Sequence, residues 1–211
     1  MADIFVSHSS HDLQEVDFFS RVAAGTNVRL IVEEFEKIVS GVVNAVTIQN
    51  HIRFAKAVFL LLSPNVHGLP HTRDWVLWES GVAANKDVWV FERYRDQGKV
   101  SVIVPFVRHY VVFEPSDACF RYFKQIIESY NDSHVLGTLL VTTGIGALIG
   151  RGGGAAAGVA AGLMMADRSN TRPAGLQLIC SNCTSSYHVH LPQGLKHFRC
   201  PICNQVLSLP S

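Results

Sequence analysis

The chain has 211 residues, and its 18 Lys and Arg residues nearly balance 17 Asp and Glu residues, for a formal net charge of +1 at pH 7. This balance leaves no excess of positive charge that would attract polyanions, so we expect no nucleic-acid partner. The length allows one medium domain and a smaller one.

The chain opens on a short apolar strand, residues 3–7, which ends in the polar turn 8–12. Asp3 and the lack of a basic stretch before an apolar run do not fit a signal peptide, so we expect a cytoplasmic protein. A helix should follow, capped by Ser10 or Asp12. Its apolar positions keep helical spacing: Leu13, Val16, Phe19 and Val22.

Strands then alternate with helices along the chain. Strands are predicted at 28–32, 58–62, 88–91 and 100–106, helices at 43–55, 74–85 and 115–130, and a loop at 66–73. This alternation is typical of an α/β fold, in which a parallel sheet is covered on both faces. Because ligands bind at the carboxyl ends of such strands, the turns after Ser7 and Leu62 are expected at the functional edge.

Two stretches carry a resemblance to a known family. Residues 3–12, Asp-Ile-Phe-Val-Ser-His-Ser-Ser-His-Asp, resemble the opening box of TIR domains. Residues 59–65, Phe-Leu-Leu-Leu-Ser-Pro-Asn, followed by Trp75-Val-Leu-Trp-Glu79, resemble a second TIR box. The resemblance covers residues 1–132 and implies a flavodoxin-like open parallel sheet with helices on both faces.

Enzymatic TIR domains cleave NAD⁺ at the bond between nicotinamide and ribose. The resemblance assigns the catalytic role to Glu79, in the second box. It implies an NAD⁺ hydrolase or cyclase that is activated by self-assembly. Residues that would contact the nucleotide are Phe5, Ser7, Ser9, Asp12 and Trp75.

The chemistry of Glu79 is sensible on physical grounds. Cleavage of a ribosyl bond passes through an oxocarbenium-like species, which a nearby carboxylate stabilises. Trp75 lies four residues before Glu79 and so shares its helix face, where an aromatic wall would raise the carboxyl pKa by desolvation. Spacing alone favours a solvated carboxylate for Glu79, and Ser7 and Ser9 can be turn and capping residues.

One family feature is missing. No Arg-Asp-x-x-Pro-Gly loop follows the second strand, and the stretch 33–41 stands in its place. Inferences about the partners of animal receptor adaptors therefore do not carry over. The short polar opening is similar to TIR proteins of bacterial type, which implies a role in antiviral defence or signalling.

A glycine-rich segment, residues 133–167, follows the predicted TIR domain. Its glycines at 146, 150, 154, 158 and 162 recur every four residues, which is a glycine zipper that lets helices approach closely. Two uncharged runs flank Arg151, and each would span about 24 Å or less as a helix. The segment is interpreted as a membrane hairpin, or alternatively as a self-association segment outside the membrane.

The last part of the chain, residues 176–211, contains two Cys-x-x-Cys pairs. Their four thiols match the spacing of a zinc ribbon, in which a structural Zn²⁺ supplies the folding energy of a module too small to fold alone. The three histidines of this part are expected at the surface, and we expect it to contact protein. The predicted ligands are Cys180, Cys183, Cys200 and Cys203.

Two functions of other classes compete with NAD⁺ cleavage. In the first, the chain is a non-enzymatic TIR adaptor anchored by the glycine zipper. In the second, TIR assembly drives the glycine-rich segment into a bilayer and disrupts it. An adaptor should keep its activity when Glu79 is substituted, whereas an enzyme should lose it.

Overall fold

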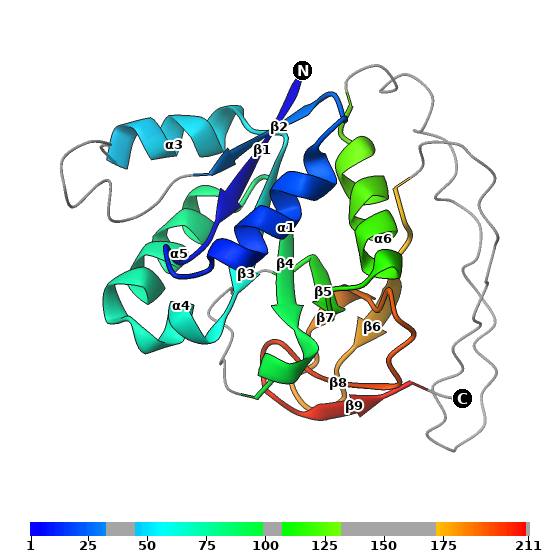
Figure 1. The fold of residues 1–211 in the computed structure, drawn as a ribbon. Coiled ribbons are helices and arrows are strands. Elements are labelled where there is room, and N and C mark those ends of the chain that lie inside the picture. Colours follow the sequence, from blue (N-terminus) through cyan, green and yellow to red (C-terminus); the bar gives the residue numbers. More distant parts are fainter. Residues whose placement is uncertain (33–44, 99–106, 132–171, 210–211) are drawn as a thin grey trace.

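A computed structural model describes residues 1–32, 45–98, 107–131 and 172–209. Within these ranges, one sheet of seven strands has the order β2-β1-β3-β4-β5-β7-β6, and β8 and β9 form a separate pair (Figure 1). The strands are β1 Ala2–Ser7, β2 Val28–Val32, β3 Ala57–Leu62, β4 Asp87–Arg93, β5 His109–Phe113, β6 Leu176–Ile179, β7 Ser186–His190, β8 His197–Arg199 and β9 Val206–Ser208.

The sheet is mostly parallel. Strands β2, β1, β3, β4, β5 and β7 all pair in parallel, and only β6 runs antiparallel, against β7. The α/β prediction is confirmed at this level. Parallel strands place their carboxyl ends at one edge, so the turns after β1, β3 and β4 gather there.

Helices cover both faces of the sheet. On one face α1 and α6 pack against β1, β3 and β4, and on the other α3 and α5 lie over the same strands (Figure 1). The helices are α1 Leu13–Ala23, α3 Ala45–Phe54, α4 Pro64–Gly68, α5 Pro70–Val82 and α6 Asp117–Glu128, with a 3₁₀ turn η1 at Tyr94–Asp96.

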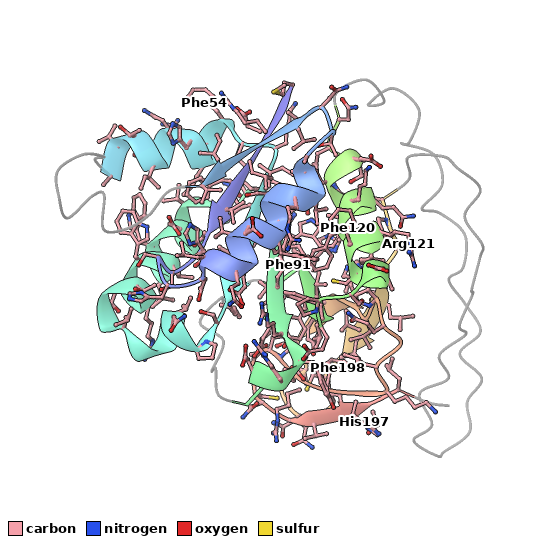
Figure 2. All side chains as sticks on the ribbon, in the orientation of Figure 1. Phe54, Phe91, Phe120, Arg121, His197 and Phe198 are labelled. Carbon is pink, nitrogen blue, oxygen red and sulfur yellow. The ribbon has the colours of Figure 1, made fainter. Side chains whose placement is uncertain are left out.

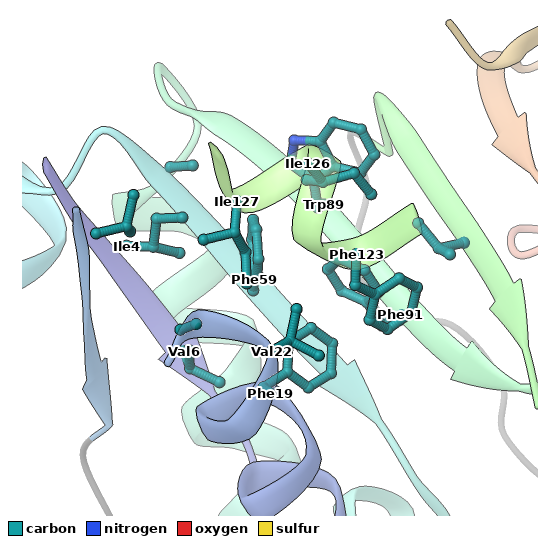
Figure 3. Packing of buried hydrophobic residues seen from close by; sticks show 14 of the residues in the cluster. Ile4, Val6, Phe19, Val22, Phe59, Trp89, Phe91, Phe123, Ile126 and Ile127 are labelled. Atoms are coloured by element: carbon teal, nitrogen blue, oxygen red, sulfur yellow. The ribbon is translucent and has the colours of Figure 1, made fainter. Parts of the chain in front are cut away.

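The core under α1 and α6 is aromatic. Phe19 from α1 lies 4.9 Å from Phe91 and 5.1 Å from Phe123 between ring centroids, and Phe59 lies 4.9 Å from Phe91 (Figure 3). All six residues of β3 are buried, as expected for a strand covered on both faces. This packing fixes the strand ends that carry the functional turns.

The predicted loop at 66–73 is wrong. Helix α4 begins directly after Ser63, whose hydroxyl accepts a hydrogen bond from the backbone N–H of Val66 at 3.3 Å, and α5 already begins at Pro70. Both helices have proline in their first turn, where the missing N–H has no helical partner to lose. The prolines therefore start helices here, although Pro70 falls within the predicted loop.

Two sequence predictions fall on residues outside the described ranges: the strand at 100–106 and the glycine-rich segment 133–167. The strand beside β4 on the side away from β3 is β5, His109–Phe113, where no strand was predicted. None of the described helices is both long and apolar enough to cross a bilayer.

The cysteine-rich part of the chain joins the sheet. Strand β7 pairs with β5 in parallel, with His109 opposite His188 and Val111 opposite His190, and β6 completes the edge. The sheet thus runs across the predicted boundary between residues 1–132 and 176–211, so two stretches far apart in the sequence share one core.

Candidate functional site

The carboxyl group of Glu79 is buried beside the end of β1. Only 2% of Glu79 is exposed. The Ser7 hydroxyl donates a hydrogen bond to Oε2, and the indole Nε1–H of Trp75 donates one to Oε1 at 2.7 Å. Burial raises the pKa of Glu79 to about 7, although both hydrogen bonds favour the charged form. Such a carboxyl group changes its protonation state near neutral pH.

Trp75 contacts this carboxyl group, and a second tryptophan, Trp78, stacks on Trp75. The rings of Trp75 and Trp78 stack with their centroids 4.7 Å apart, and Trp78 is 36% exposed. Trp75 packs partly against the core, one turn from Glu79 on the same helix. The predicted pairing of an aromatic ring with the carboxyl group is present, and Trp75 also donates to it.

Asp12 ties together the turns after β1 and β3. Its carboxylate accepts hydrogen bonds from the Ser63 hydroxyl and from Asn65 Nδ2, both at 2.7 Å, and from the backbone N–H of Ser9 at 3.2 Å. The predicted capping of α1 by the Asp12 side chain is wrong, because Asp12 occupies the N-cap position without a side-chain capping bond. The carboxylate instead accepts hydrogen bonds from Ser63 and Asn65, which follow β3 at the start of α4.

A pocket of about 480 Å³ lies at this edge of the sheet. Asp12, Ser63 and Asn65 line it together with Arg93, the last residue of β4, and Arg95, which follows in η1. Among the described residues, neither Glu79 nor Trp75 belongs to its lining. The pocket therefore adjoins the turns of both TIR-like boxes without reaching the buried carboxyl group.

The other predicted nucleotide contacts are enclosed. Phe5 is fully buried in the core cluster on the α3 and α5 face. Ser9 is 1% exposed, and its carbonyl accepts hydrogen bonds from the Asp12 N–H at 2.8 Å and from His8 Nδ1 at 2.7 Å. Ser9 holds the turn, and its contact with a nucleotide stays a prediction, as does that of Phe5.

The four predicted metal ligands come together. Their sulfur atoms lie within 4.8 Å of one another, with Cys180 Sγ 3.6 Å from Cys203 Sγ and Cys183 Sγ 3.8 Å from Cys200 Sγ. Tetrahedral coordination with bonds of about 2.3 Å requires sulfur atoms about 3.8 Å apart. Two of the sulfur pairs thus have the separation that tetrahedral coordination needs, and all four thiols lie close enough to hold one metal ion.

The two Cys-x-x-Cys turns have the same backbone pattern. The N–H of Thr184 donates to the carbonyl of Cys180 at 2.9 Å, and the N–H of Asn204 donates to that of Cys200 at 3.0 Å. Thr184 and Asn204 have φ values of 59° and 62°, so each turn ends in a left-handed residue. This repeated geometry presents two thiols from each turn to the same point.

The fifth cysteine, Cys119, lies apart on α6 and is buried in the aromatic core.

The expectation that the histidines of the cysteine-rich part lie at the surface is wrong for His190. It is 1% exposed, and its ring nitrogens lie 2.6 Å from the Tyr122 hydroxyl and 3.1 Å from His109 Nδ1. Burial lowers the pKa of His190 to about 3. Its position on β7, against β5 and α6, explains this, and no sequence pattern within the cysteine-rich part reveals the pairing.

A second buried carboxyl group, Glu92, was not predicted. Glu92 directly follows the apolar residues of β4. It is 2% exposed and accepts a hydrogen bond from the Tyr110 hydroxyl. Burial raises its pKa to about 7 as well. The sequence signal is a charged residue directly after the apolar run Val88–Phe91, at the functional edge of a buried strand.

No known family model matches this chain, and no curated protein matches it either.

Proposed function

We propose that the chain is a TIR-type NAD⁺ hydrolase or cyclase in which Glu79 is the catalytic residue. The observation that carries the proposal is the buried Glu79 carboxyl group, with a pKa near 7 and hydrogen bonds from Ser7 and Trp75. Strongly perturbed carboxyl groups at the functional edge of an α/β sheet are typical of active sites.

The sheet supports the same proposal. Its first five strands follow the order β2-β1-β3-β4-β5, which is the order of flavodoxin-like doubly wound sheets. The two TIR-like boxes supply the turn after β1 and the helix after β3, and the hydrogen bond from Ser7 to Glu79 joins them. The family resemblance and the topology thus point to the same residues.

The chemistry requires the ionised form of Glu79. A carboxylate beneath the ribose stabilises the positive charge that develops as the bond to nicotinamide breaks, and it can hold the ribose hydroxyls. Nicotinamide leaves as a neutral base, and water or an atom of the same nucleotide takes its place at the ribose. The Ser7 and Trp75 hydrogen bonds favour the charged form that this step uses.

With only 2% of Glu79 exposed, NAD⁺ reaches its carboxyl group only after neighbouring side chains move. We propose that self-assembly supplies this change, so the isolated chain is inactive and the assembled chain is active. A cytoplasmic location, association with membranes through residues 133–167, and a role in bacterial defence belong to the same proposal.

The test is NAD⁺ consumption by the full chain, dilute and under crowding that forces assembly, with products separated by chromatography. The proposal expects turnover in the assembled wild type and at least a hundredfold loss in Glu79→Gln, which keeps the size of the side chain and removes its charge. If assembled wild type leaves NAD⁺ intact, or Glu79→Gln turns over at the wild-type rate, the proposal is wrong.

For the four cysteines we propose a structural Zn²⁺. Four thiolates already complete a tetrahedral shell, which is the composition of a closed structural site. We expect one zinc per chain by elemental analysis and none in Cys180→Ser/Cys203→Ser. Chelation should lower the melting temperature of the wild type, because β6 and β7 belong to the main sheet. A wild-type chain that purifies without metal and keeps its melting temperature in chelator would contradict this assignment.

A further inference from the structure

A second pocket, of about 380 Å³, lies between η1 and the β8–β9 pair. Tyr94, Arg95 and Gln97 form one wall, and His197 and Arg199 belong to the other. His197 and Phe198 lie on β8, beyond the carboxyl ends of β4 and β5 (Figure 2). The pocket thus joins two stretches about a hundred residues apart and requires the cysteine-rich part to be in place.

The lining of this pocket is basic. Arg95 and Arg199 supply two guanidinium groups, and among the described residues no carboxylate belongs to the lining. Within the described ranges, neither guanidinium pairs with an acid; Arg199 Nη1 donates to the carbonyl of Asn204 at 3.2 Å. The neighbouring acid Glu114 accepts from the backbone N–H of Arg95 at 3.0 Å. Positive charge without a counter-charge favours an anionic ligand.

The walls are held in register before any ligand binds. Gln97 accepts a hydrogen bond from the backbone N–H of Arg199 at 3.1 Å and donates one to the Tyr110 hydroxyl at 2.8 Å. Gly98, with φ of 88°, packs under the Arg199 side chain, where an added Cβ would lie 3.1 Å from Nε. A preformed pocket lowers the entropy cost of binding.

We propose that this pocket binds a nucleoside diphosphate, with its phosphates on Arg95 and Arg199 and its base against Tyr94. Guanidinium groups match phosphate oxygens in charge and geometry. The Tyr94 residue is 40% exposed and offers an aromatic ring to a base, and base–aromatic stacking is tolerant of base identity. The volume lies in the range of about 300–1,000 Å³ that small-molecule sites occupy. The site is distinct from Glu79 and does not depend on the proposed cleavage of NAD⁺.

The test is calorimetric titration of the metal-loaded full chain with ADP, adenosine and inorganic phosphate. We expect ADP to bind more tightly than either fragment, and Arg95→Gln and Arg199→Gln each to weaken ADP binding about tenfold. Tyr94→Leu should weaken it about fivefold or more through lost stacking. The matched control is Arg121→Gln, an exposed arginine on α6, which should bind ADP like the wild type.

Several results would overturn the proposal. The first two are no ADP binding at millimolar concentration and equal losses of ADP affinity in Arg121→Gln and Arg95→Gln. The others are phosphate binding as tight as that of ADP, and a single-stranded RNA that displaces ADP at a lower concentration. Loss of ADP binding in Glu79→Gln but not in Arg95→Gln would place ADP at the proposed active site and also overturn it. If Arg199→Gln does not fold by circular dichroism, Tyr94→Leu decides, since Tyr94 lines this pocket whereas Arg95 also lines the pocket of about 480 Å³ beside Asp12.

Discussion

The Ser7 hydroxyl donates a hydrogen bond to the buried Glu79 carboxyl group across 72 residues of sequence. Ser7 ends β1, and Glu79 lies on α5, which follows β3. This hydrogen bond favours the carboxylate, whereas burial favours the neutral acid and raises the pKa of Glu79 to about 7. Ser7 therefore moderates the pKa of the proposed catalytic group.

Removing this hydrogen bond should move the pH dependence of NAD⁺ cleavage. With the Ser7 donor gone, the pKa of Glu79 rises, by about one unit for a charged hydrogen bond of about 1.5 kcal/mol. The rate of Ser7→Ala should therefore fall at pH 7 and recover at higher pH, in a pH–rate profile under assembling conditions.

The matched control is Ser80→Ala, on the same helix, because the Ser80 hydroxyl donates to the backbone carbonyl of Leu77 at 2.8 Å. Its profile should match the wild type. Identical midpoints for Ser7→Ala and the wild type would show that Ser7 does not govern the titrating group.

Asp12 should contribute substantially to stability. Replacing it by alanine leaves the donors of Ser63, Asn65 and Ser9 without their acceptor in a buried site, which we expect to cost about 3 kcal/mol of unfolding free energy in urea. Asp17→Ala is the control, since Asp17 pairs with Arg21 at the exposed surface and should cost less than about 0.5 kcal/mol. Equal losses in the two variants would contradict the role of Asp12.

Substitutions at the residue that ends each Cys-x-x-Cys turn should change the unfolding free energy in opposite directions. Thr184 adopts a φ of 59°, which is unfavourable for a β-branched residue, whereas Asn204 tolerates its φ of 62°. Thr184→Asn should raise the unfolding free energy of the metal-loaded chain by about 0.5–1 kcal/mol, and Asn204→Thr should lower it by a similar amount. Denaturant unfolding of both variants checks this, and changes of the same sign would contradict it.

His190 should make the fold sensitive to acid. Burial is the main cause of its lowered pKa of about 3, and the positive charges of His109, His188 and Arg172 add to it, whereas Asp87 opposes it. The unfolded chain binds a proton near pH 6.5 and the folded chain does not. The stabilising contribution of neutral His190 is therefore fully present above pH 6.5 and is lost as the pH falls toward 3.

His190→Gln should accordingly reduce the loss of unfolding free energy between pH 6.5 and 3, by up to roughly 4 kcal/mol. His197→Gln provides the control, because His197 is exposed on β8. Urea unfolding at several pH values measures the slope of unfolding free energy against pH for each variant. A wild-type slope in His190→Gln would show that other groups cause the acid sensitivity.

Much of the α/β fold could be predicted because its signals are local. Apolar runs such as Val58–Leu62 are buried on both faces, and the helical spacing after Asp12 predicted α1. The four cysteines were also predictable, since each Cys-x-x-Cys turn brings two thiols together by itself. The loop predicted at 66–73 was wrong because a proline is compatible with the start of a helix as well as with a loop, and the sequence does not distinguish the two.

The remaining features depend on contacts between distant residues. No local pattern indicates that β7 pairs with β5, and the burial of His190 follows from that pairing alone. The hydrogen bonds that Asp12 accepts from Ser63 and Asn65 likewise come from residues more than 50 positions away. The placement of Glu79 was inferred from family resemblance, since spacing alone allows a solvated carboxylate.

The most direct test of the central claim is nicotinamide release from NAD⁺ by the assembled full chain, comparing Glu79→Gln with Glu92→Gln. Both residues are buried carboxyl groups with a pKa raised to about 7, but only Glu79 lies against Ser7 and Trp75. We expect Glu92→Gln to release nicotinamide at the wild-type rate and Glu79→Gln to release almost none. Equal rates in the two variants, or no release by the assembled wild type, would contradict the claim.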